Sequence, residues 1–343
     1  MQAEMDALDA APRVGRWRCV RLIARGSFGA VYEGVDDNGE RAAIKVADGQ
    51  HPQTVPRFAR EVAVMRALPR NPHLVGFYEA GQLGDGQPWV AMELVVGITL
   101  REVIHAAPLP EEAVLGVMEQ ICGALGEVHR MGLSHGDIKP ANLMMATEPK
   151  PIVKLLDFGL VRDSAGLLRR MERTRKLPTD AFAKELDAGR LMGTPQYLAP
   201  EAILDAYLAQ DAAALRDPAS DVFALGVILS ELLTGRAPWP FVPDAWSRNE
   251  YIRQTAAYVA LRGRVDGLQL ARPPNVAREL WCIVRSCLAS DRNLRYDHAV
   301  HIRDALRGYG RRNSLLPRPL FRDRARLVAD RITSQIRKRR SRT

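Results

Sequence analysis

The sequence predicts an α+β fold in two unequal lobes, a small β-rich lobe followed by a larger and mainly helical one. Short strand-like runs separated by turn residues fill most of residues 17–94. Beyond Gly97 the apolar residues recur mainly at helical spacing. The chain has 343 residues and is 47% hydrophobic, which is enough for a large buried core.

The small lobe is expected to hold five strands and one helix. The first strands are joined by hairpin turns, one of them the run Asp36-Asp37-Asn38-Gly39-Glu40. The helix covers residues 56–68, because Phe58, Val62 and Met65 recur on one of its faces. The strands are expected around Val20 and at residues 31–35, 42–46, 74–80 and 89–94.

The larger lobe is expected to hold four helices. The first is amphipathic, and the second is strongly apolar from Val222 to Leu233. They cover residues 111–131, 219–235, 276–289 and 298–307.

The net charge of +9 is concentrated at the C-terminus. Residues 311–343 carry twelve Arg or Lys and two Asp, so the rest of the chain is close to neutral. A helical stripe from Phe321 to Ile336 precedes the basic run 337–340. This tail would suit an anionic membrane surface or nucleic acid. Docking on the body of the protein and a fully solvated tail remain open as alternatives.

The cysteines favour a reducing compartment. None of the four lies in a CxxC pair, so free thiols in the cytoplasm are expected. No run approaches the roughly 18 apolar residues of a membrane span. The N-terminal residues lack the cationic start and apolar core of a secretory signal. We therefore expect a cytoplasmic protein, with the tail as a candidate for membrane association.

A glycine-rich turn, Ala24–Val31, joins the first two strands. Gly26 and Gly29 would let the backbone approach phosphate groups closely. The turn lies between strands and does not open a helix, which argues against a Rossmann-type dinucleotide site. Taken alone, it could also be an ordinary hairpin.

Lys45 ends the third strand, and Glu61 lies on the helix that follows. A lysine there can hold phosphate oxygens while the carboxylate fixes its position. As an isolated pair, the two could equally form a surface salt bridge.

The segment His135–Asn142 gathers groups that can share one active site. Asp137 could accept a proton from a hydroxyl, and Asn142 could bind a metal through its amide oxygen. Lys139 would place a positive charge on a transferring phosphoryl group. Asp157 follows an apolar strand and is a natural ligand for Mg²⁺, since this ion prefers oxygen donors.

In this order and spacing, the segments resemble the eukaryotic-type (Hanks-type) protein kinase superfamily, most of all its bacterial members. The resemblance covers residues 17–308. It includes Ala43-Ile44-Lys45, Asp157-Phe158-Gly159 and Ala199-Pro200-Glu201.

This resemblance implies a bilobal protein kinase fold with a small β-rich N-lobe, one main helix in that lobe, and a larger α-helical C-lobe. It gives a leader at residues 1–15, a kinase domain at 16–310 with lobes at 16–95 and 96–310, and a basic tail at 311–343.

The activity implied is that of a serine/threonine protein kinase, which moves the γ-phosphate of ATP to protein hydroxyls and extends to autophosphorylation. Gly193–Glu201 resembles the substrate-docking segment of such kinases. Together with Lys139, two residues after Asp137, it argues for Ser or Thr acceptors over Tyr. Such kinases often activate in trans, so a transient homodimer is expected.

The resemblance also assigns site residues. Catalytic roles fall to Asp137, Lys139, Lys45 and Glu61, and two Mg²⁺ ions to Asn142 and Asp157. Met92 would be the gatekeeper, with the backbone of Glu93 and Val95 meeting adenine. The residues implied to bind ATP are Ala24, Gly26, Gly29, Val31, Ala43, Lys45, Met92, Glu93, Val95 and Met144.

Supporting contacts are implied as well. Asp221 would brace the catalytic loop, and Arg295 would pair with Glu201. An internal spine of the active state would consist of Met65, Phe77, His135 and Phe158.

The sequence departs from the family pattern at two positions. Ala24 replaces the first glycine of the turn, which predicts slower or weaker use of ATP. Gly136 stands where the family has an arginine that binds an activation-loop phosphate. We therefore expect activity that does not strictly require that phosphate. Thr174 and Thr179 lie in the long insert 162–190 as candidate phosphorylation sites, although that insert could be an exposed loop without a regulatory role.

Two other functions remain as alternatives. His-Gly-Asp also occurs in small-molecule kinases of the aminoglycoside and choline kinase type, which lack the docking segment. A catalytically weak nucleotide-binding scaffold is the second alternative, and only Ala24 favours it.

Overall fold

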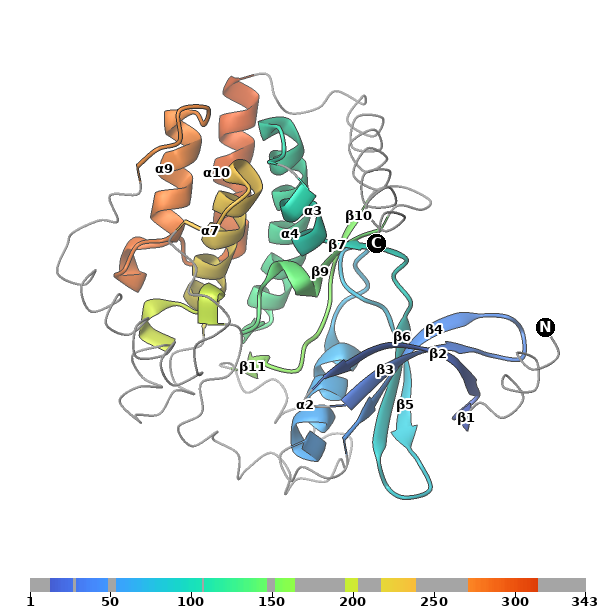
Figure 1. The fold of residues 1–343 in the computed structure, drawn as a ribbon. Helices are drawn as coiled ribbons and strands as arrows, with labels where there is room; N and C mark the ends of the chain where they lie inside the picture. The colour runs from blue at the N-terminus through green and yellow to red at the C-terminus, as the bar shows by residue number, and fades with distance from the viewer. Residues whose placement is uncertain are drawn as a thin grey trace, which may run out of the picture.

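The structure is a computed structural model with two lobes, a curved sheet carrying one helix and a bundle of helices (Figure 1). It describes residues 13–26, 29–48, 54–106, 108–146, 152–163, 195–202, 217–238 and 271–313. The 162–190 insert beyond Asp163, with Thr174 and Thr179, lies outside these ranges, as do Thr194 and the tail from residue 314.

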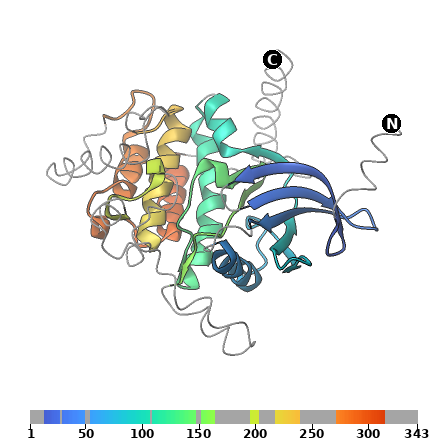
Figure 2. The ribbon, with the colours of Figure 1, turned by 60° about the horizontal axis from the view of Figure 1, so that its bottom comes forward.

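The small lobe is a six-stranded antiparallel sheet in the order β1-β2-β3-β4-β6-β5. Its strands are β1 (Arg13–Val14), β2 (Trp17–Gly26), β3 (Gly29–Val35), β4 (Arg41–Ala47), β5 (Phe77–Gln82) and β6 (Pro88–Glu93). Helix α2 (Thr54–Ala67) lies beside the sheet in both views (Figures 1 and 2). All five expected strands and the helix are present, within a few residues of their predicted bounds.

Strand β1 lies inside residues 1–15, which were predicted to be a leader. A turn at Gly15, whose φ is 59°, folds it back onto β2. This places Val14 and the fully buried Trp17 in a core cluster with Trp89. The Trp17 indole nitrogen also donates to Glu79 Oε1 at 2.6 Å. The ordered sheet therefore begins by Arg13.

The larger lobe is built around α7, which is buried along nearly its whole length. Asp217 caps the start of α7 by accepting from two backbone amides, and Gly235 ends it in the left-handed conformation. The described helices of this lobe are α3 (Leu100–Ala106), α4 (Glu111–Arg130), α7 (Pro218–Thr234), α9 (Arg278–Cys287) and α10 (Ala299–Arg312). All four predicted helices are present, and α10 extends five residues beyond its predicted end.

Short strands between the lobes position the catalytic segments. Strand β8 (Leu133–Ser134) pairs with β11 (Arg162–Asp163). The segment that follows β8 and the segment that precedes β11 therefore lie together. Strand β9 (Leu143–Ala146) pairs with β10 (Ile152–Leu155) and with β7 (Gly97–Thr99). Within the described ranges, none of the helices combines the length and the apolar character that a membrane span requires.

Candidate active site

Lys45, Glu61 and Asp157 come together from β4, α2 and the segment after β10. Lys45 Nζ lies 2.7 and 2.8 Å from the two oxygens of Glu61 and 3.2 Å from Asp157 Oδ1. The pair is not the surface salt bridge that the sequence left open, because the Glu61 side chain is only 4% exposed.

Lys45 and Asp157 stabilise each other's charge, whereas burial, together with Asp157, raises the pKa of Glu61. Burial would lower the pKa of Lys45, but Glu61 and Asp157 together raise it well above its ordinary value. Burial would likewise raise the pKa of Asp157, but Lys45 outweighs that effect and holds it well below its usual range. Lys45 is therefore cationic and Asp157 anionic at neutral pH.

A cavity of about 230 Å³ opens between the glycine-rich turn and α2. Lys45, Glu61 and Asp157 line it, and so do four more of the residues predicted for ATP: Ala24, Gly26, Gly29 and Val31. Cations from two elements, Arg25 and Arg57, also line it. The cavity lies on one side of the sheet and can therefore accept a negatively charged group.

The other residues predicted to bind ATP are not among those that line this cavity. Ala43 and Met92 pair directly across β4 and β6, and Met144 lies on β9. The amide of Glu93 donates to the carbonyl of Gly76 at 2.8 Å. An adenine contact of Glu93 would therefore use its carbonyl oxygen. Val95 follows β6 in the connection between the lobes.

Asp137, Lys139 and Asn142 form one hydrogen-bonded group. Lys139 Nζ lies 2.7 Å from Asp137 Oδ2. The Asn142 amide nitrogen donates to the backbone oxygen of Asp137 at 2.9 Å and to Oδ2 at 3.1 Å. These two acceptors fix the side-chain amide, so that Asn142 Oδ1 faces away from Asp137.

Asn142 and Asp157 offer oxygen donors suited to Mg²⁺. The Leu156 amide donates to the backbone oxygen of Asn142 at 2.9 Å, which brings the two ligand residues to adjoining segments. Mg²⁺ is typically bound by one or two such side chains together with substrate phosphates. In the part of the chain that is described, no group of three or more His, Cys, Asp or Glu could hold a metal ion.

Asp221, near the start of α7, holds the backbone of the catalytic loop. Its two oxygens accept from the amides of His135 at 2.7 Å and Gly136 at 2.9 Å. His129 Nδ1 accepts from the amide of Ala299 at 3.2 Å, so its Nε2 carries the proton and donates to Asp221 at 3.0 Å. Burial would raise the pKa of Asp221, but these hydrogen bonds lower it.

Phe158 is fully buried beneath the site. Its ring lies 5.1 Å from that of His135, which is hydrogen-bonded through Nε2 to the oxygen of Leu156. Met65 is buried in the same core cluster, and Phe77 packs against that cluster. The four residues predicted as a spine therefore belong to one packed region, with Asp157 facing Lys45.

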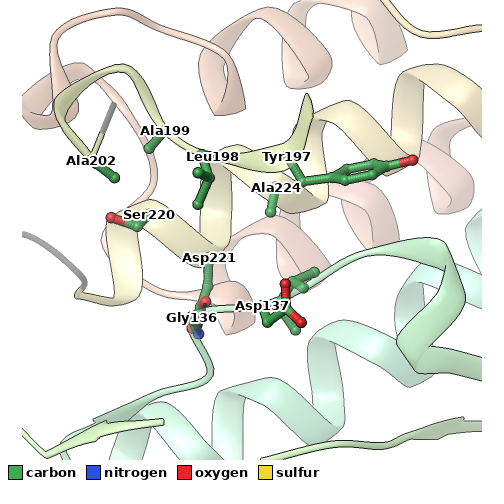
Figure 3. Close-up of a pocket in the computed structure, with 10 residues that line it drawn as sticks. Gly136, Asp137, Tyr197, Leu198, Ala199, Ala202, Ser220, Asp221 and Ala224 are labelled. Carbon is green, nitrogen blue, oxygen red and sulfur yellow. Dashed lines mark hydrogen bonds between the residues drawn. The ribbon is translucent and has the colours of Figure 1, made fainter. Parts of the chain in front are cut away.

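The segment Pro195–Ala202 lies over the start of α7 and the loop at Gly136–Ile138, around a hollow of about 20 Å³ (Figure 3). Glu201 forms two hydrogen bonds of 2.7 Å with the buried guanidinium of Arg295, the predicted pair. Tyr197 Oη donates to Glu231 of α7, which also accepts from Gln196. The described part of the docking segment is thus held to the helical lobe at Gln196 and Tyr197 and again at Glu201.

Three residues of the site were missed by sequence reasoning: Arg57, His129 and Lys154. Arg57 Nε donates to the oxygen of Gly159 at 2.9 Å, and Lys154 Nζ lies 2.8 Å from Glu93 Oε2. A lysine inside an apolar strand, and an arginine one helical turn before Glu61, were signals that could have revealed two of them.

Comparisons with known proteins agree with this arrangement. Residues 17–305 match the family model described as "Protein kinase domain". The chain is 35% identical over 269 residues to serine/threonine-protein kinase PknL of Mycobacterium tuberculosis, covering 77% of this chain and 60% of PknL. It is 35% identical over 243 residues to serine/threonine-protein kinase PknA of the same species, covering 67% of this chain and 50% of PknA.

A third match comes from another organism. Serine/threonine-protein kinase Pkn1 of Myxococcus xanthus is 33% identical over 233 residues, or 66% of this chain and 30% of Pkn1. The matched region thus spans about 60% or less of the length of these curated relatives.

Proposed function

The chain belongs to the protein kinase family, and from that premise we propose that it is a serine/threonine protein kinase that uses ATP. The observation that carries the proposal is the group Lys45–Glu61–Asp157, which closes one side of a cavity bordered by the glycine-rich turn. A largely buried lysine between two carboxylates is suited to hold phosphate oxygens at a fixed place.

In this proposal each side chain has a defined task. Lys45 binds phosphate oxygens of ATP, and Glu61 keeps it in place. Asp157 and Asn142 hold Mg²⁺, which neutralises charge on the phosphates when bound. Asp137 orients the acceptor hydroxyl and takes its proton, while Lys139 stabilises charge on the transferred group. The rate gain comes mainly from positioning and electrostatics.

A protein acceptor is favoured over a small molecule by the segment Pro195–Ala202. Hydrogen bonds to Arg295 and Glu231 hold the backbone of this segment in place. The segment lies across a small hollow from Asp137 (Figure 3). An extended peptide needs such a surface, whereas a small molecule does not. Autophosphorylation and a transient homodimer are part of the same proposal and rest on the family resemblance.

Cytoplasmic location is proposed on the chemistry of the cysteines. All four are free thiols, and three of them are buried. Contact of the basic tail with anionic lipid or nucleic acid is proposed from its sequence alone. Helix α10 ends at Arg312, so the tail should be removed from residue 314 onward when binding to anionic vesicles and DNA is compared.

The test is transfer of labelled phosphate from ATP. The wild-type chain should label a basic protein on Ser and Thr in the presence of Mg²⁺, and Asp137→Asn should lower the rate on the order of 10²-fold or more. Label on an aminoglycoside or choline but not on protein would favour the small-molecule alternative. Equal label with the variant would overturn the role of Asp137. Mapping the labelled residues on the chain itself tests autophosphorylation.

A further inference from the structure

Arg57 lies on α2 one turn before Glu61, on the same side of the helix. Its Nε donates to the backbone oxygen of Gly159 at 2.9 Å. Helix α2 is therefore joined to the Asp157–Gly159 turn at two points, through Arg57 directly and through Glu61 by way of Lys45.

The turn is packed closely around Gly159. A Cβ atom there would lie 3.2 Å from Asp157 Oδ1, 3.3 Å from Glu61 Oε2 and 3.6 Å from Arg57 Nε. The three side chains thus meet at one backbone position. A movement of Arg57 would therefore also displace the Asp157 carboxylate.

Asp157 requires such support from outside its own segment. Its φ of 59° is the only positive value among the described non-glycine residues. A residue held in this region costs about 1–3 kcal/mol and persists only where its surroundings enforce it. The amide of Gly159 gives only a long contact of 3.4 Å to Asp157 Oδ1.

The two attachments differ in what happens when nucleotide binds. In the proposed function Lys45 turns to phosphate oxygens and Asp157 to Mg²⁺, so both ends of their 3.2 Å contact acquire other partners. The Gly159 oxygen has no such competing role, and Arg57 holds it through Nε, so that a phosphate bound by another nitrogen of Arg57 would not displace this bond. The Arg57 hydrogen bond can therefore hold the turn at the stage when the Lys45 contact is weakened.

We propose that Arg57 is a positioning residue, which holds the Asp157–Gly159 turn against α2 and so sets the geometry in which Asp157 binds the metal ion. This inference rests on the proposed function. It predicts that loss of Arg57 acts on metal affinity and turnover, with little effect on the affinity for the nucleotide base.

The test compares Arg57→Gln with Arg60→Gln, a change of the same kind on the same helix. In the described part of the chain Arg60 has no hydrogen bond or ion pair with the site. The first readout is Mn²⁺ binding, measured by electron paramagnetic resonance with a non-hydrolysable ATP analogue. Loss of one hydrogen bond predicts roughly five- to tenfold weaker Mn²⁺ binding and a similar fall in kcat for Arg57→Gln. Arg60→Gln should change neither by more than about twofold.

A second variant separates positioning from general damage. Arg57→Ala should regain Mn²⁺ affinity when guanidinium ion is added, and Arg60→Ala should show no response. Mn²⁺ affinity of Arg57→Gln equal to that of Arg60→Gln would overturn the proposal. So would a loss of kcat with unchanged Mn²⁺ affinity, or an absence of rescue by guanidinium.

Failure of the proposed function gives a different result. A wild-type chain that binds Mn²⁺ and the ATP analogue but transfers no phosphate would contradict the kinase proposal. The Mn²⁺ measurements on the Arg57 variants would still decide the role of Arg57.

Discussion

Glu93 and Lys154 form an ion pair that joins the end of β6 to β10 across the boundary between the lobes. Lys154 Nζ lies 2.8 Å from Glu93 Oε2, and the amide of Gly76 donates to the same oxygen at 3.1 Å. The Lys154 side chain is 10% exposed and that of Glu93 is 29% exposed. Because Glu93 is also a residue predicted to meet adenine, this pair links the nucleotide site to the strand that leads into Asp157.

Lys154→Met should destabilise the chain by about 2 kcal/mol, less than for a fully buried pair because Glu93 keeps some contact with water. The cause is a carboxylate left without its cation. Urea unfolding measures the loss, and KM for ATP should rise as the connection between the lobes loosens. The double variant Glu93→Gln with Lys154→Met removes the unpaired charge and keeps an oxygen acceptor for the Gly76 amide, so it should recover most of the stability. A single variant as stable as the wild type would show that the pair contributes nothing.

Gly136→Ala should lower both stability and kcat. The φ of Gly136 is 76°, and a Cβ there would lie 2.6 Å from the oxygen of Leu160. Strain of this kind costs roughly 1–3 kcal/mol, and it would fall on the residue next to Asp137. Gly123→Ala on α4, where a Cβ meets nothing within 4 Å, is the matched control and should be neutral or slightly stabilising. Equal effects of the two changes would contradict this account.

Enzyme treated with a phosphatase should keep most of its turnover. An arginine at position 136 would form an ionic contact with a phosphate on the activation loop, and Gly136 cannot. Loss of that phosphate therefore breaks one ionic contact fewer in this chain. Initial rates before and after treatment measure the effect, with the phosphate content followed by mass spectrometry. A near-complete loss of activity would refute the prediction.

The raised pKa of Glu231 predicts that the free energy of unfolding depends on pH below neutrality. Burial raises its pKa from an ordinary 4.5 to about 7, although Tyr197 and Arg101 act in the opposite direction. Since the folded state binds this proton more tightly, the wild-type free energy of unfolding should fall, relative to Glu231→Gln, as pH rises from about 4.5 to 7. Above that range the difference should be constant. A difference that does not vary with pH would show that folding leaves the pKa of Glu231 unchanged.

Much of the fold could be predicted because its signals are local. The apolar spacing of 111–131 and 219–235 predicted α4 and α7 almost to their ends. Strand β1 was not predicted because two residues are too few to show an alternation of apolar and polar side chains. Its pairing also depends on the turn at Gly15 and on the distant Trp89. Sequence order alone does not report such a contact.

The site was predictable where one motif holds both partners, as in Asp137 and Asn142. The roles of Arg57 and His129 were not predicted because neither residue lies in a motif that the resemblance carries, and their partners, Gly159 and Asp221, are distant in sequence. The equally distant pair Glu201 and Arg295 was predicted because both residues lie in such motifs. Gly136 shows both what could be predicted from the sequence and what could not. Its identity suggested a missing cation, whereas its positive φ shows a backbone reason for a residue without a side chain.

Asp221 gives the catalytic loop a further property. Its carboxylate holds two successive amides of the loop, and it stands on a helix buried along nearly its whole length. The conformational entropy of His135 and Gly136 is therefore lost when the chain folds and not when a substrate arrives. Binding energy from ATP and the acceptor need not order this loop, and remains available for bringing the two lobes together.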